Sequence, residues 1–196
     1  MTGDDRRSRE RRAEGTSSAR RSRPSLHELV ENGEISDAEL EERARETLLR
    51  VLTAAPKSRV ELAQSLGRKG YPERVVGPLL DRFEEVGLVD DASYAEMLVR
   101  TRHGERSLSR RAIAAELRRR GIDEETSASA LDQVDDDSEA DAARDLARAR
   151  LRRTAGLDRD VRIRRAVGAL ARKGYSPSLA FEVVQRELDE EPSLDD

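Results

Sequence analysis

The chain has 196 residues, of which 40% are Asp, Glu, Lys or Arg and 36% are hydrophobic, with two Phe, three Tyr and no Trp. This composition is too polar for one large compact core, whereas small modules each need less apolar material. The absence of Cys excludes disulfides, thiolate zinc sites and cysteine nucleophiles. The only histidines, His27 and His103, are too far apart in sequence to suggest a metal site.

Targeting and membrane segments are not evident in the sequence. No apolar run approaches the roughly 18 residues that a membrane span requires, and the N-terminus has no apolar stretch of the kind found in signal peptides. We therefore expect a cytoplasmic protein that has no membrane partner.

The formal net charge of −4 conceals a strong segregation of charge. Residues 1–25 carry eight Arg and four acids, a net of +4; residues 100–120 carry eight Arg and two acids, a net of +6. Residues 144–173 carry eleven bases and three acids, a net of +8, whereas residues 123–141 contain nine acids and no base. Local potential steers partners, so this alternation favours electrostatic recognition. Ordinary solvent-facing helix surfaces remain the simpler alternative.

The two ends of the chain differ from its middle. Residues 1–24 contain almost nothing apolar and cannot bury enough surface to offset the entropy of ordering. We assign residues 1–35 to a disordered, Arg-rich leader and residues 189–196 to an acidic tail. The folded part is then expected between residues 36 and 188.

Three helices are expected in the first third of the folded part. Apolar residues recur there at helical spacing, and each run is bounded by residues that favour helix ends. Ser36 and Ser58 are each followed by Glu three residues later, which is the pattern of a capping box. The expected helices are bounded by Ser36 and Pro56, by Ser58 and Gly70, and by Pro72 and Gly87.

The same unit recurs twice. Gly70, Gly121 and Gly174 are separated by 51 and 53 residues, and each has a Leu four residues before, a Lys or Arg one before, and Tyr or Ile one after. Each glycine is expected to be the left-handed C-cap that ends a second helix. The sequence therefore predicts an all-α protein with three tandem three-helix repeats, over residues 36–90, 91–136 and 137–188, that form an elongated, curved array.

Catalytic patterns are missing from the sequence. There is no phosphate-binding Walker loop and no Gly-rich dinucleotide turn. Acidic residues such as Asp90, Asp91 and the run 135–137 fall just before expected helices, where acids cap free N–H groups. We expect a protein without enzymatic activity, without catalytic, cofactor-binding or metal-binding residues, and without a small-molecule substrate.

Arginines are the residues with binding potential. Guanidinium groups suit bidentate contact with carboxylate or phosphate, so either an acidic protein surface or single- or double-stranded DNA fits them. Aromatic residues do not alternate with the arginines, so a base-stacking platform is not expected. In the third repeat the arginines include Arg150, Arg152, Arg153, Arg159 and Arg164. The candidate partner-binding residues are Arg100, Arg102, Arg110, Arg111 and Arg118 in the second repeat and Arg162 and Arg165 in the third.

The second repeat resembles a known family. The run of residues 87–91, Gly-Leu-Val-Asp-Asp, precedes Tyr94-Ala95, Arg100, Arg110, Ile113, Glu116-Leu117 and Arg120-Gly121-Ile122. This pattern resembles the core motif of the bacterial regulatory protein RecX family, the modulators of the RecA recombinase. The Arg-Lys-Gly-Tyr turns at 68–71 and 172–175 fit the outer repeats of that family. The resemblance covers about residues 37–188 and does not include the leader.

The resemblance implies a three-repeat, all-helical protein without enzymatic activity that lies along the groove of the RecA filament on single-stranded DNA. It would bridge successive protomers and limit filament growth, ATP hydrolysis and strand exchange, in the setting of DNA repair, homologous recombination and the SOS response. Contact with DNA is also implied. The resemblance does not assign particular arginines to RecA.

A helix-turn-helix transcription factor is the alternative hypothesis. Residues 60–91 on their own are similar to a winged-helix DNA-binding domain. No strand-forming wing follows Asp91, however, and acids outnumber arginines in residues 73–85, the helix that would enter the DNA groove. The regulator is therefore the leading interpretation.

Overall fold

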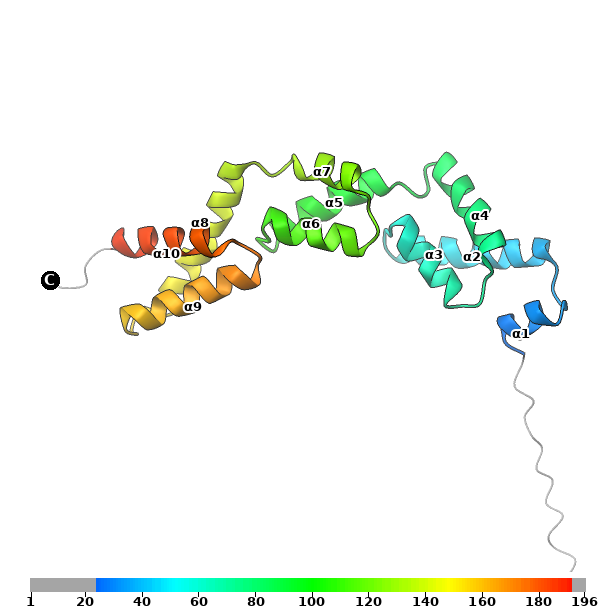
Figure 1. The fold of residues 1–196 in the computed structure, drawn as a ribbon, viewed down its shortest axis with the longest axis horizontal. Helices are drawn as coiled ribbons and strands as arrows, with labels where there is room; N and C mark the ends of the chain where they lie inside the picture. Colours follow the sequence, from blue (N-terminus) through cyan, green and yellow to red (C-terminus); the bar gives the residue numbers. More distant parts are fainter. Residues whose placement is uncertain (1–23, 192–196) are drawn as a thin grey trace, which may run out of the picture.

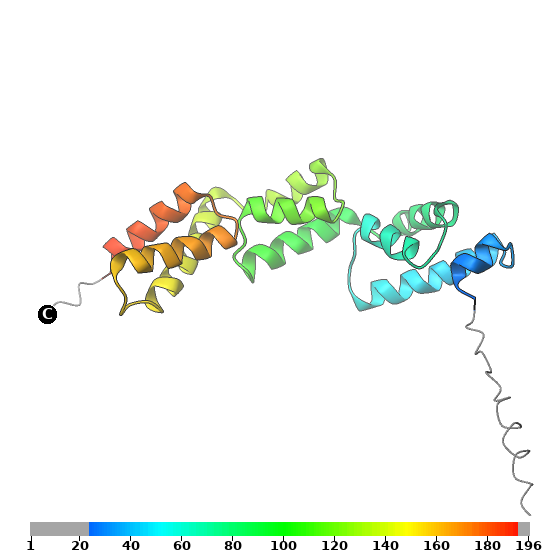
Figure 2. The same cartoon turned by 60° about the horizontal axis from the view of Figure 1, so that its bottom comes forward.

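The computed structural model describes residues 24–191, which contain ten α-helices and no strand. The expected leader up to residue 23 and the last residues of the tail, 192–196, lie outside the described residues. Nine of the helices form three groups of three that follow one another in a row (Figure 1). A second view shows the same extended row (Figure 2). The prediction of an elongated, all-α repeat protein is confirmed.

Each unit is a bundle in which every helix packs against the other two. Unit one comprises α2 (Asp37–Ala54), α3 (Arg59–Gly67) and α4 (Glu73–Glu85). Unit two comprises α5 (Asp91–Gly104), α6 (Arg110–Arg119) and α7 (Glu124–Leu131), and unit three comprises α8 (Asp136–Arg152), α9 (Arg159–Arg172) and α10 (Pro177–Asp189).

Side-chain caps explain where most of these helices begin. Ser36 and Ser58 form the expected capping boxes with the Glu three residues later. Asp90 accepts a hydrogen bond from the backbone N–H of Ser93 at 2.9 Å, and Asp135 accepts one from Ser138 at 2.8 Å. These two carboxylates therefore stabilise helix N-termini, as the sequence predicts.

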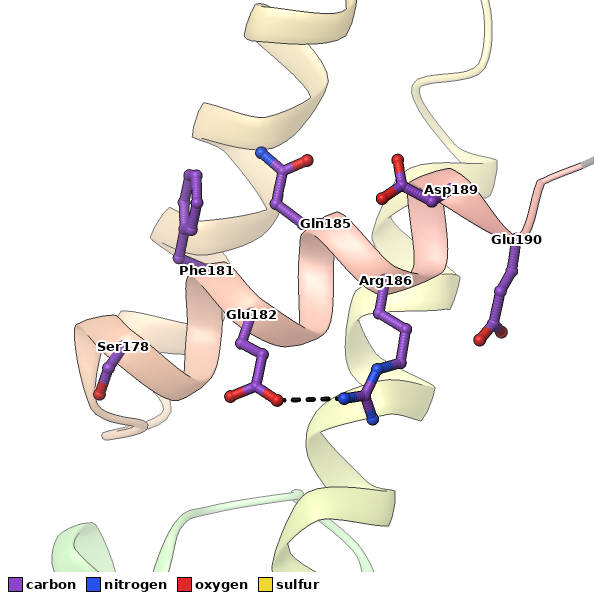
Figure 3. Close-up of a pocket in the computed structure, with 7 residues that line it drawn as sticks. All are labelled: Ser178, Phe181, Glu182, Gln185, Arg186, Asp189 and Glu190. Atoms are coloured by element: carbon purple, nitrogen blue, oxygen red, sulfur yellow. Dashed lines mark hydrogen bonds and ion pairs between the residues drawn. The ribbon is translucent and has the colours of Figure 1, made fainter.

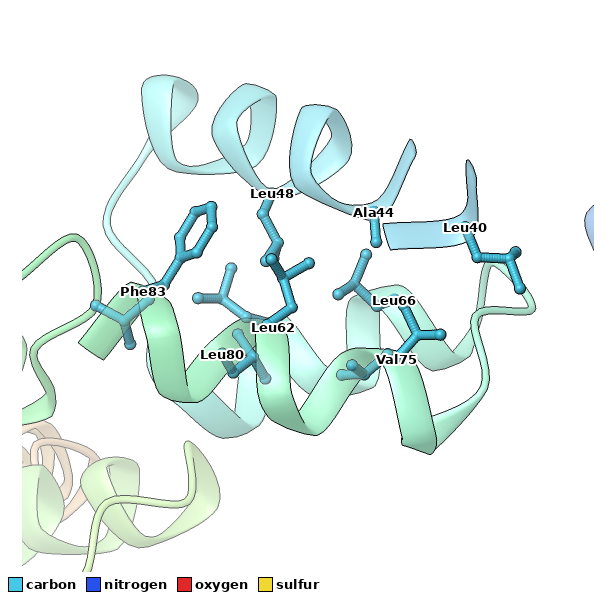
Figure 4. Close-up of a cluster of buried hydrophobic side chains, with 11 residues drawn as sticks. Leu40, Ala44, Leu48, Leu62, Leu66, Val75, Leu80 and Phe83 are labelled. Atoms are coloured by element: carbon cyan, nitrogen blue, oxygen red, sulfur yellow. The ribbon is translucent and has the colours of Figure 1, made fainter. Parts of the chain in front are cut away.

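Each unit buries its own small core. In unit one, apolar side chains from α2, α3 and α4 point toward one another, including Leu48, Leu62, Leu66 and Phe83 (Figure 4). The cores of units two and three are equally separate, and Tyr175 is fully buried in the third. Dividing the apolar residues among three cores is how a chain with so many charged residues can still fold.

The expectation of disorder across residues 1–35 is wrong for its last part. Helix α1 (Leu26–Glu31) begins with a complete capping box between Ser25 and Glu28. Leu26 and Val30 are partly buried against the core of unit one. Ser25 and Glu28 show the same capping-box pattern that predicts the helices after Ser36 and Ser58, so the sequence did carry a signal for this helix.

The three repeat glycines have the same backbone conformation. Gly70, Gly121 and Gly174 have φ angles of 89°, 80° and 93°, which lie in the left-handed region that favours glycine. In each turn the residue after the glycine donates its N–H to the carbonyl of the Leu four residues before the glycine, at 3.1–3.2 Å. This hydrogen bond is typical of a Schellman C-cap.

Candidate partner-binding surfaces

The units meet in two similar junctions. In each junction the N-terminus of the second helix of one unit contacts the glycine turn of the next unit. At the first junction, between units one and two, the Ser58 hydroxyl donates to the carbonyl of Arg120 at 2.5 Å. At the second junction, between units two and three, the N–H of Ser109 donates to the carbonyl of Lys173 at 3.0 Å. Both serines are buried, so the contacts exclude water.

Gly121 and Gly174 are also required for a second reason, because a neighbouring helix packs closely against each of them. A Cβ at Gly121 would lie 2.5 Å from the Cβ of Val60. A Cβ at Gly174 would lie 2.6 Å from both the Cβ of Ala112 and the Oγ of Ser109. No side chain fits at these distances, so glycine is required both for the left-handed turn and for the approach of the neighbouring helix.

A carboxylate from the next unit completes each junction. Asp91 accepts from the N–H of Arg59, the first residue of α3, at 2.8 Å, and Glu139 accepts from the N–H of Arg110, the first residue of α6, at 2.8 Å. The prediction that Asp91 caps its own helix is therefore wrong, because its side chain reaches the helix of the preceding unit. Burial raises the pKa of Asp91 at this position.

The first junction contains a partly buried group of charged side chains. Arg120 donates to Glu61 at 2.9 Å, to the Tyr94 hydroxyl at 2.6 Å and to Glu116 at 2.8 Å. Arg102 forms a two-pronged pair with Glu116, with both N···O distances at 2.8 Å. Hydrogen bonding by Arg102 is the largest cause that lowers the pKa of Glu116, to about 2. The group links α3, α5 and α6.

Arg102 is consequently an internal residue. Its side chain is 15% exposed and that of Glu116 is 14% exposed. Sequence reasoning placed Arg102 among the partner-binding arginines because a helical spacing does not show which arginine has an internal acid. Arg102 is therefore a candidate whose guanidinium is already paired with Glu116.

The second junction relies on backbone carbonyls as acceptors. Arg111 donates to the carbonyl of Gly174 at 3.1 Å, and Lys173 donates to the carbonyl of Arg106 at 2.7 Å. The hydroxyl of Tyr175 donates to the carbonyl of Ser107 at 3.1 Å. Burial raises the pKa of Tyr175 to about 12, so this phenol keeps its proton at neutral pH.

The other candidate arginines differ in their availability. Arg100, Arg118 and Arg165 are exposed and form no ion pair within residues 24–191. Arg110 lies 3.5 Å from Asp136 at the second junction and keeps part of its side chain exposed. Arg162 is 12% exposed and pairs with Glu191 at 2.6 Å, so this candidate already has an acidic partner in unit three.

Unit three forms a hollow that is lined mainly by arginine. The C-terminal end of α8 and the outer face of α9 enclose about 500 Å³. Sequence reasoning grouped several of these arginines but missed Arg172, although residues 164, 168 and 172 share one helix face at a spacing of four. The residues that line this arginine hollow are Arg150, Arg153, Thr154, Arg164, Arg165, Gly168 and Arg172.

Helix α10 presents a different surface. Phe181, with 52% of its surface exposed, lines an open hollow of about 770 Å³ together with Gln185. Glu182, which also lines it, pairs with Arg186 at 3.1 Å (Figure 3).

The described part of the chain contains no group of three acidic or histidine side chains arranged to hold a metal. No helix in that part is long and apolar enough to cross a membrane.

This architecture defines a tandem helical-repeat protein whose outer surfaces carry arginines. Family models for the first, second and third three-helix domains of RecX match residues 44–83, 90–131 and 137–184. The chain therefore belongs to the RecX family of regulatory proteins.

Similar proteins agree with this assignment. The chain is 48% identical to the regulatory protein RecX of Thermobifida fusca, over 81% of this chain and 86% of that protein. It is 47% identical to the one of Streptomyces coelicolor, over 76% and 80%. A crystal structure of regulatory protein RecX shares the fold with a TM-score of 0.68 at 24% identity, over 84% of this chain and 81% of that one. RecX from Lactobacillus salivarius has a TM-score of 0.67 at 21% identity, over 76% and 97%.

The winged-helix alternative lacks its defining element. A wing would follow Asp91 as a strand, but helix α5 begins at that residue, and residues 24–191 contain no strand. The matching residues 60–91 belong to one unit of the repeat and the start of the next.

Proposed function

We propose that this chain is a non-enzymatic, cytoplasmic regulator that binds the RecA filament on single-stranded DNA. It lies along the filament groove, bridges successive RecA protomers, and limits ATP hydrolysis, filament extension and strand exchange. The observation that supports this proposal most is the row of three units in a chain that belongs to a family of regulatory proteins.

A row of linked units suits a repetitive partner. Each unit can contact a different protomer, and the linkage makes the later contacts effectively intramolecular, so weak contacts add to strong binding. This gain requires the units to keep their spacing. The buried hydrogen bonds and close glycine contacts at both junctions favour a constant spacing.

The proposed RecA contacts are the accessible arginines of unit two. Arg100 and Arg118 are exposed, and Arg110 and Arg111 lie at the edge of the second junction. Because Arg111 also bonds Gly174, changing it would disturb the junction together with the surface. Arg100 and Arg118 therefore give the cleaner test.

The test is RecA's ATP hydrolysis on single-stranded DNA, titrated with the full chain. We expect saturable inhibition. Changing Arg100→Glu and Arg118→Glu together should raise the concentration for half-inhibition by at least about tenfold, because reversed charges destroy electrostatic complementarity. The melting temperature should change little, since both side chains are exposed.

The matched control is Arg43→Glu with Arg50→Glu, two exposed arginines of α2. We expect this variant to inhibit like the parent. Unchanged ATP hydrolysis at every concentration of the parent chain would contradict the proposal. Tight, sequence-specific binding to duplex DNA without RecA would instead support a transcription factor.

A further inference from the structure

We propose that the arginine hollow of unit three binds the phosphodiester backbone of single-stranded DNA. Its lining includes five arginines, from α9 and from the end of α8 and the turn that follows it, and no acid. This proposal names the DNA contact within the proposed function, and its test uses DNA without RecA. The DNA contact and the regulation of RecA can therefore be disproved separately.

The arginines of the hollow have no internal partner. Within residues 24–191, Arg150, Arg153, Arg164, Arg165 and Arg172 form no ion pair, and none donates a side-chain hydrogen bond. Arginines of the same unit that lie outside the hollow do have acids: Arg148 pairs with Glu187 and Arg159 with Asp189. Five uncompensated guanidinium groups around one hollow create a strong positive potential and favour an anionic ligand.

The backbone of unit three holds these arginines in place. Arg164, Gly168 and Arg172 follow one another along a single face of α9, and Arg165 lies beside Arg164. Arg150 is in the last turn of α8, and Arg153 is its C-cap. The guanidinium of Arg172 lies next to Gly168, 3.5 Å from where a Cβ would stand at that position. The donors are thus distributed over two packed elements, so they can contact more than one phosphate.

The lining favours phosphate over a protein partner. The centres of protein interfaces are commonly apolar and desolvated, with aromatic residues as anchors. The hollow has no apolar or aromatic side chain, since its remaining members are Thr154 and Gly168. It also offers no ring on which a base could stack, so binding should depend on the backbone and not on the base sequence.

The experiment measures binding of the full chain to a fluorescein-labelled oligothymidine by fluorescence anisotropy, over a series of salt concentrations without RecA. The variant is Arg164→Gln, Arg165→Gln and Arg172→Gln together. Loss of three phosphate contacts should weaken binding by on the order of tenfold or more and reduce the slope of log affinity against log salt by about 2. Circular dichroism checks that the helices remain.

The matched control removes three exposed arginines of unit one, by Arg43→Gln, Arg50→Gln and Arg68→Gln. We expect this control to bind like the parent. Equal weakening of both variants would overturn the proposal, because it would show a general effect of charge. The proposal would also be overturned if the variant with the three arginines of the hollow changed bound DNA as tightly as the parent. If that variant bound DNA normally but no longer inhibited RecA, the hollow would be a contact for protein.

Competition with inorganic tripolyphosphate distinguishes DNA from a free polyphosphate as the ligand of the hollow. It carries neighbouring phosphates without a nucleic acid backbone. We expect it to displace the oligothymidine only weakly at equal phosphate concentration, because a longer chain engages all five arginines together. Complete displacement at that concentration would assign the hollow to a free polyphosphate and overturn the proposal.

Discussion

The two junctions join similar units in different ways. Both place a glycine turn on a serine-capped helix N-terminus and complete it with a carboxylate from the next unit. The first junction adds partly buried charge pairs around Arg120, whereas the second adds donors to backbone carbonyls. The shared part fixes the relative position of the units. In the first junction Arg120, which reaches across to Glu61, is also held within unit two by Glu116, a carboxyl group with a strongly lowered pKa.

The largest effect is expected from filling the glycine contacts. Gly121→Val and Gly174→Val should each lower the free energy of unfolding by about 3 kcal/mol or more, since left-handed strain adds to overpacking. Gly70→Val should cost less, about 1–2 kcal/mol, because the nearest atom to its Cβ would be the His27 nitrogen at 3.3 Å. Urea unfolding measures all three. Equal losses of stability at all three glycines would show that the close approach at the junctions adds nothing to the cost of a side chain.

The second prediction tests how much the charged group around Arg120 contributes to stability. Glu116→Gln should cost on the order of 2–3 kcal/mol at neutral pH, because the pKa of Glu116 falls from its ordinary value of 4.5 to about 2 on folding. A lowered pKa stabilises the fold above pH 4.5, and this stabilisation disappears as the pH falls toward 2. The difference between parent and variant should therefore shrink over that range.

Urea unfolding at several pH values checks this difference. The exposed Glu46 of α2 supplies the control, and Glu46→Gln should change stability by less than about 0.5 kcal/mol. A constant difference between parent and Glu116→Gln from neutral pH down to pH 2 would be incompatible with the assigned role of this carboxylate.

The third prediction concerns the part that both junctions share. Asp91→Ala and Glu139→Ala should each cost about 1 kcal/mol, as expected for loss of a carboxylate that satisfies a helix N-terminal N–H. Thermal unfolding followed by circular dichroism gives both values. A loss at one position and none at the other would mean that the junctions are not equivalent.

The smallest effect is expected at the N-terminal end of the array. Removing residues 1–34 should cost about 1 kcal/mol or less, because α1 contributes only partly buried side chains. Without α1, Gly70→Val should become less costly, since His27 supplies the atoms nearest to its Cβ. Comparing Gly70→Val in the two backgrounds by urea unfolding measures this coupling. If the losses of stability from Gly70→Val and from the truncation simply add, α1 does not contact the Gly70 turn.

The sequence predicted the fold better than the surfaces. Helix boundaries and glycine turns depend on local rules of capping and backbone conformation, so they could be predicted from neighbouring residues. Which arginines are accessible depends on partners far away in sequence. Arg102 is paired with a residue fourteen positions away, and Arg162 with one twenty-nine positions away, so neither could be sorted from Arg165 by helical spacing alone.

The junction roles were harder to predict for the same reason. Asp91 precedes a helix and has the sequence pattern of a local cap, yet it bonds Arg59 of the preceding unit. The arginine hollow needs the end of α8 to meet α9, a contact that neither helix specifies by itself. Helix α1 likewise depends on unit one for its apolar contacts.

The most direct measurement is an electron cryo-microscopy reconstruction of RecA filaments on single-stranded DNA with the full chain bound. The proposed function predicts continuous helical density in the filament groove that contains all three units and contacts more than one RecA protomer. The arginine hollow of unit three should face the DNA. Density confined to a single protomer or to the filament end, or no added density at saturating protein, would contradict the proposal that the array bridges the filament.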